Sequence, residues 1–183
     1  MISNVSSYNN VNSVSRSYQQ SSVNKTQEFA LDSRKDLQDN AILSSLHLET
    51  GESIGIYYDE TSPADKKLLV AKIIGPDGST REVKIDPEEV DPENASYVEM
   101  LALSAHLKQQ GKIDGPAGAL ATMVFEKRVK EANAKNNVYD RQDFVSGMNE
   151  FVNNALKDGQ MDTYLRYLKE LTIYLGLKTN SKY

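Results

Sequence analysis

The sequence predicts an α+β fold, in which a small antiparallel β-meander of about four strands is followed by about four packed helices. Between residues 44 and 86, apolar and polar residues alternate with a period of two, and turn-forming residues separate the runs. Between residues 91 and 178, apolar residues recur every three or four positions, which is the spacing of amphipathic helices. We therefore expect a single α+β domain over residues 44–178.

Residues 1–27 differ in composition from the rest of the chain. They are dominated by Ser, Asn and Gln, and the first acidic residue is Glu28. Ser and Asn side chains compete for backbone hydrogen bonds, and the few apolar residues cannot offset the entropy lost on ordering. The composition predicts a disordered tail.

An alternative for this tail is a helix that forms only against a partner. Its apolar residues recur every three or four positions and would form one stripe on a helix. These residues are Ile2, Val5, Tyr8, Val11, Val14 and Tyr18. A partner groove could order such a stripe, so Val5, Tyr8 and Val11 are candidate partner-binding residues.

Residues 28–43 mix charges of both signs with sparse apolar residues. They predict either a linker or a short helix that leads into the first strand.

The meander is expected over residues 44–86. Residues 50–52, Thr-Gly-Glu, predict the turn of a first hairpin, and residues 75–78, Gly-Pro-Asp-Gly, predict a tight turn between the third and fourth strands. In the fourth strand, Val83 and Ile85 share the face that we expect to be buried.

The helical half is expected over residues 91–178, where helix-capping and helix-breaking residues separate the helices. Asp91 followed by Pro92 predicts the first helix start, and Gly111 its end. The second helix is expected to open at residues 114–116, Asp-Gly-Pro. Asp140 is expected to cap the third helix, and a further Asp-Gly pair separates it from the fourth.

The last two helices each show an apolar stripe that we expect to face the core. In the third helix it consists of Phe144, Met148, Phe151, Val152, Ala155 and Leu156. In the fourth it consists of Met161, Tyr164, Leu165, Leu168, Leu171 and Leu175.

Two tyrosines of the last helix are further candidates for binding a partner. Tyr167 and Tyr174 are seven residues apart, so they share one face of the helix beside the core stripe. Tyr is favoured at protein interfaces because its ring is apolar and its hydroxyl can stay hydrated. The alternative is that both rings edge the core.

Composition excludes several function classes. A net charge of −5 without a long basic run argues against nucleic acid as a ligand. The absence of Cys excludes disulfides and thiolate chemistry. The sequence has no run of about 18 apolar residues, so no membrane span is predicted. The first twenty residues lack the apolar core of a secretory signal. The expected compartment is therefore the cytoplasm.

No residue pattern predicts catalysis, a cofactor or a metal. His47 and His106 are the only histidines, and neither has a partner at the spacing of a metal-binding pair. The acidic run over residues 86–93 lacks the order of a Ca²⁺ loop, and helix capping and dipole complementation account for it. We expect no catalytic, cofactor-binding or metal-binding residues.

Two segments carry a resemblance to other proteins. The chain begins Ile-Ser-Asn-Val-Ser-Ser-Tyr over residues 2–8, and a later segment runs from Ile85-Asp86-Pro87 to Asp91-Pro92-Glu93-Asn94-Ala95-Ser96-Tyr97. On these segments the chain resembles small uncharacterised bacterial proteins, and its acid-free start resembles flagellar and type III export signals. The resemblance implies a compact domain behind an N-terminal address, and it assigns no functional residues.

The main functional hypothesis is therefore a non-enzymatic protein-interaction or structural protein with a protein partner. The alternative is a flagellum-associated or type III-type exported substrate or effector, in which residues 1–27 act as the export signal. An enzyme is the third interpretation.

Overall fold

The computed structural model describes residue 37 and residues 40–46, 50–63, 66–132 and 137–180, with side chains up to residue 177. The predicted tail at residues 1–27, with Val5, Tyr8 and Val11, lies outside the described residues. The strand position predicted for His47 also lies outside them, as does most of the segment predicted as a linker or short helix.

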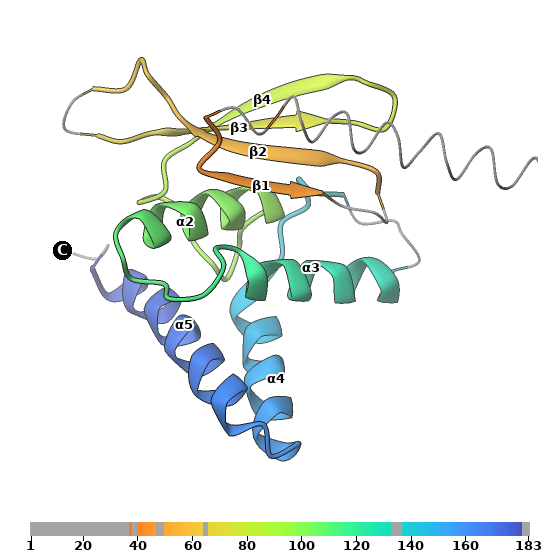
Figure 1. Cartoon of the computed structure of the whole chain (residues 1–183), viewed down its shortest axis with the longest axis vertical. Helices are drawn as coiled ribbons and strands as arrows, with labels where there is room; N and C mark the ends of the chain where they lie inside the picture. The colour runs from red at the N-terminus through yellow and green to blue at the C-terminus, as the bar shows by residue number, and fades with distance from the viewer. Residues whose placement is uncertain (1–36, 38–39, 47–49, 64–65, 133–136, 181–183) are drawn as a thin grey trace, which may run out of the picture.

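The described strands form one antiparallel sheet at the N-terminal side of the domain (Figure 1). The strands are β1 (Leu43–Leu46), β2 (Ser53–Tyr58), β3 (Leu69–Ile74) and β4 (Thr80–Ile85). Each pairs with the next in the sequence, in the order β1-β2-β3-β4. The predicted four-stranded meander is confirmed.

One face of this sheet packs on the helical half. Leu69, Ala71 and Ile73 alternate with partly exposed residues along β3, and all three are buried. The register places Ile54 opposite Ile73 and Ile56 opposite Ala71, which gives a continuous apolar surface across β2 and β3. The first helix after the sheet covers this surface.

The described helices follow the sheet, as the sequence predicts. They are α2 (Tyr97–Gln109), α3 (Ala119–Glu131), α4 (Phe144–Lys157) and α5 (Met161–Asn180). Together with the sheet they confirm the α+β class. In Figure 1, α4 and α5 run away from the sheet and meet at the opposite end of the molecule, as an antiparallel hairpin.

Two predicted helix starts are wrong by several residues. The side chain of Ser96, not Asp91, caps α2, and Ser96 forms a reciprocal capping box with Glu99. Asp143, not Asp140, caps α4. The two predicted caps instead close turns in the preceding loops, because their carboxylates accept backbone N–H groups there.

The start of the second helix is also later than predicted. The helix α3 begins after Gly118, whose φ of 74° requires a residue without a Cβ, and not at the Asp-Gly-Pro of residues 114–116. Those three residues belong to the loop that joins α2 to α3.

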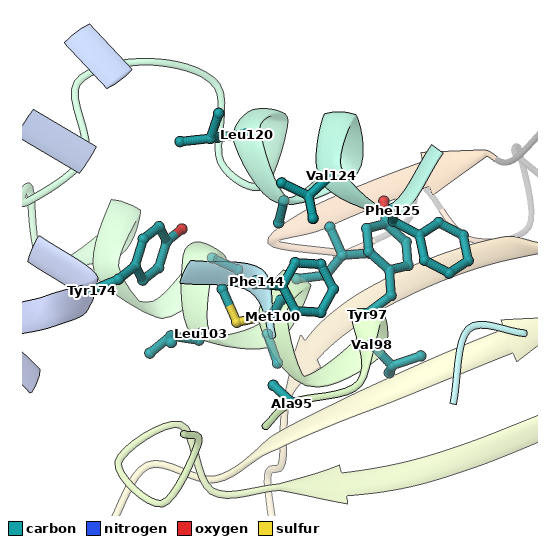
Figure 2. Close-up of a cluster of buried hydrophobic side chains, with 14 of the residues drawn as sticks. Ala95, Tyr97, Val98, Met100, Leu103, Leu120, Val124, Phe125, Phe144 and Tyr174 are labelled. Atoms are coloured by element: carbon teal, nitrogen blue, oxygen red, sulfur yellow. The ribbon is translucent and has the colours of Figure 1, made fainter. Parts of the chain in front are cut away.

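A buried cluster joins α2 to α3 and to the sheet (Figure 2). The Tyr97 ring stacks on Phe125, with ring centroids 4.4 Å apart. The Tyr97 hydroxyl lies 2.8 Å from Thr122 Oγ1 and 3.3 Å from Ser45 Oγ, so its polar atom has partners in the core. Burial raises the pKa of Tyr97 to about 12.

The helices α3 and α4 approach closely at a glycine. A Cβ at Gly147 would lie 2.5 Å from Val124 Cγ1, so a larger residue there would push the helices apart. An isolated antiparallel β-bridge also fixes the chain just before α4, because Ala95 and Gln142 exchange both backbone hydrogen bonds. These contacts hold α4, and with it the hairpin, against the rest of the domain.

Candidate interaction surface

The helix α5 carries apolar residues on two faces. Leu171 and Tyr174 are buried on its inner face. On its outer face, Met161 is 52% exposed, Leu165 is 55% exposed and Leu175 is 41% exposed. The prediction that Met161, Leu165 and Leu175 point into the core is therefore wrong.

The outer face has a regular spacing. Its residues are Met161, Leu165, Leu168, Thr172 and Leu175, which we call the outer stripe. Their separations of four, three, four and three residues keep them in line along the helix. This is also the spacing at which one helix packs along another in a coiled coil. Leu168 is half-buried and the other four are exposed.

A buried polar chain fixes the rotation of α5 about its axis. The Tyr174 hydroxyl lies 2.7 Å from Ser104 Oγ of α2, and Ser104 Oγ donates to the Met100 carbonyl at 2.7 Å. The Tyr174 hydroxyl also donates to Glu170 Oε1 at 3.2 Å. Turning α5 to bury the outer stripe would break these contacts and leave buried polar atoms without partners.

The hydrogen bonds of this chain depend on whether Glu170 is protonated. Burial raises the pKa of Glu170, although Tyr174 and the nearby Arg166 partly oppose the effect. Three contacts join the four groups, and the Ser104 and Tyr174 hydroxyls supply only two hydrogens. With Glu170 ionised, one of the three contacts lacks a hydrogen; protonation of Glu170 would supply it by reversing the Tyr174–Glu170 hydrogen bond.

The two tyrosines predicted to share an outward face lie in different surroundings. Tyr174 is fully buried and belongs to the same cluster as Met100 and Leu103 (Figure 2), which agrees with the alternative of a core position for this ring. Tyr167 is half-buried, and its hydroxyl donates to Met123 Sδ of α3 at 3.2 Å. A role for Tyr167 in binding a partner stays a prediction.

No family model, curated protein or solved structure matches this chain. The residues and their geometry therefore carry the functional argument.

The tip of the hairpin exposes a further apolar side chain. Leu156 lies in the last turn of α4 and is 46% exposed, although the sequence predicts that it faces the core. It lies at the same end of the hairpin as Met161 and Leu165, because only a short loop separates α4 from α5. Exposed apolar side chains that gather in this way mark interaction sites more often than scattered single ones do.

Charged residues border one side of the outer stripe. Asp162 and Lys169 are seven residues apart, so they lie on the same side of α5, two turns from each other. Lys169 forms an ion pair with Asp114 of the α2–α3 loop, and this contact lowers the pKa of Asp114. The border therefore carries an acid near the tip and an ion-paired lysine towards the base.

A groove of about 270 Å³ runs between α3 and α4. Phe151, predicted as the centre of the buried side of α4, is only half-buried and lines this groove. Lys127 of α3 reaches across to Glu150 of α4 at 2.5 Å and to Glu131 at 3.4 Å. The pair with Glu150 joins the two helices across the groove, whereas Glu131 lies on α3 itself, one turn from Lys127.

The residues considered for chemistry have structural partners. His106 Nε2 lies 2.6 Å from Gln110 Nε2, and burial lowers the pKa of His106. In the acidic run, Asp86 forms an ion pair with Lys66 and accepts the backbone N–H of Glu88 at 3.0 Å. Over the described part of the chain, no three His, Asp or Glu side chains gather as a metal site would require.

Within the described ranges, no helix combines the length and apolarity needed to cross a bilayer.

Sequence reasoning missed both the outer stripe and Glu170, although each left a signal. The apolar residues of α5 occupy more of its circumference than a single neighbour can cover. Glu170 stands directly before the buried Leu171, on the inner side of the helix, where an acid without a partner would be costly.

Proposed function

We propose that this protein is an interaction module that presents the outer stripe of α5 to a helical protein partner. The single observation that carries the proposal is the straight row from Met161 to Leu175, in which three large apolar side chains are more than 40% exposed. Solvent-facing helix positions normally carry polar residues, whereas an apolar row at this spacing fits a second helix.

Site-specific photo-crosslinking in the expressing cell tests this proposal. A photoreactive residue at Leu165 should give a discrete protein adduct, because the partner would lie against it. The matched control is Asn153, which is exposed on α4. Equal adduct yields at the two positions would remove the basis of the proposal.

The export hypothesis rests on the composition of residues 1–27 and stays a separate proposal. A reporter protein fused behind these residues should be exported if they form an address. A reporter that remains inside a cell with an active flagellar or type III apparatus would contradict it.

A further inference from the structure

We propose that the partner of the outer stripe is a second copy of this chain, with the two α5 helices packed antiparallel about a two-fold axis near residues 166–167. This inference rests on the proposed function. It adds the identity of the partner and the register of the contact.

The spacing of the stripe allows it to pair with itself. Antiparallel packing at this register places Leu165 of one copy against Leu168 of the other, and Met161 against Thr172, with each contact made twice. Leu175 then lies level with the hairpin tip of the other copy, where Leu156 is exposed. Apolar residues from both ends of the stripe are covered in this arrangement.

The charges beside the stripe favour the antiparallel direction. In an antiparallel pair of identical helices, each flank lies beside the same flank of the other copy. Asp162 of one chain therefore approaches Lys169 of the other, and this contact is made twice. Lys169 already contacts Asp114 of its own chain, and its ammonium group has three hydrogens to share. In a parallel pair this flank would face Tyr164 and Leu171, and Leu171 is buried inside its own domain.

The size of the contact sets the strength of association. Residues 161–175 form about 22 Å of helix at 1.5 Å per residue. A helix pair of this length buries less than the roughly 800 Å² per partner of a standard interface. Contacts below the standard size are typical of weak, transient association, so the dimer is expected to be reversible and to depend on protein concentration.

Sedimentation velocity of the full chain, from about 5 to 500 μM, is the first test. The protein should shift from monomer to dimer across this range. Leu165→Glu should weaken association at least tenfold by placing two charges in the seam, whereas Asn153→Glu on α4 should leave it unchanged. A monomer at all concentrations, or equal effects of the two variants, would overturn the inference.

A charge exchange tests the antiparallel register. Asp162→Lys and Lys169→Asp should each weaken self-association, because each places like charges together. A mixture of the two variants should form heterodimers more readily than either variant pairs with itself, since every flank then meets the opposite charge. A mixture no stronger than its components would refute this register.

The photo-crosslinking result separates this inference from the proposed function. An adduct between Leu165 and a second copy supports both. An adduct with a different protein, or with residues 1–27 of the same chain, from a monomeric sample overturns the second-copy inference. An adduct with a different protein leaves the interaction module standing, and no specific adduct at Leu165 removes both.

Discussion

The central helix α2 and the peripheral helix α5 use apolar residues differently. Nearly every side chain of α2 from Tyr97 to Leu107 is buried, because the sheet lies on one side of the helix and α3 and α5 contact others. In α5 the inner face is buried to a similar degree, whereas Met161, Leu165 and Leu175 face solvent. An apolar pattern thus shows which faces can be buried, and the number of neighbours decides which of them are.

The largest expected effect lies in the shared core of the domain. Phe144 is fully buried at the start of α4, so Phe144→Ala should lower the free energy of unfolding by about 3–5 kcal/mol. Phe151 lines the groove between α3 and α4 and is half-buried, so Phe151→Ala should cost about half as much. Denaturant unfolding compares the two variants. Equal losses would show that the groove is as tightly packed as the core.

The polar chain on the inner face of α5 should give the next largest effect. Tyr174→Phe removes the hydroxyl that Ser104 and Glu170 contact, and it should cost about 1–3 kcal/mol because buried polar atoms lose a partner. Tyr167→Phe is the matched control, since the Tyr167 hydroxyl donates to Met123 Sδ, a weak acceptor. A larger loss in Tyr167→Phe would contradict the buried chain.

The pH dependence of stability tests the protonation of Glu170. Burial raises its pKa above the ordinary value of 4.5, so the folded state favours the protonated form. Its stabilising contribution is fully present below about pH 4.5 and is lost as the pH rises through the folded-state pKa. The Glu170→Gln variant should therefore gain stability relative to the natural protein as the pH rises from about 4.5 through the folded-state pKa, and the difference should then stay level. A difference that stays constant with pH would show that folding does not raise the pKa of Glu170.

The smallest expected effect belongs to the outer stripe. Leu165→Ala, measured at low protein concentration, should change the free energy of unfolding by less than about 0.5 kcal/mol, because the side chain is mostly exposed. Leu171→Ala on the inner face of the same helix should cost about 2–5 kcal/mol. If the two variants lost equal stability, the two faces of α5 would be equally buried in solution.

Local patterns predicted the sheet and the order of the helices well. The meander followed from alternation along β2 and from the apolar, β-branched run of β3, where the face of Ile54, Ile56 and Ile73 is covered from one side. The helix starts were less predictable, because Asp91-Pro92 and the Ser-x-x-Glu of residues 96–99 are both cap signals five residues apart. Only the course of the loop decides between them.

The position of the candidate surface depended on contacts distant in sequence. Ser104 is 70 residues from Tyr174, and no local pattern indicates that their hydroxyls meet. With that contact made, Leu165 faces outward, against the sequence prediction, and Tyr174 lies in the core, which was one of its two predicted positions. The spacing of the outer stripe was visible in the sequence, but its exposure follows from the absence of a further helix on that side among the described elements.

The bridge between Ala95 and Gln142 has a consequence for folding kinetics. Its two hydrogen bonds close a loop that contains all of α2 and α3, so the bridge has to form after those helices have been brought together. The hairpin of α4 and α5 is local by comparison and can assemble early as an independent unit. If a preformed hairpin docks late, the contacts that attach α4 and α5 to the rest of the domain should be the first to open. Hydrogen exchange should then show the amides of Ala95 and Gln142 opening together, before those of β2 and β3.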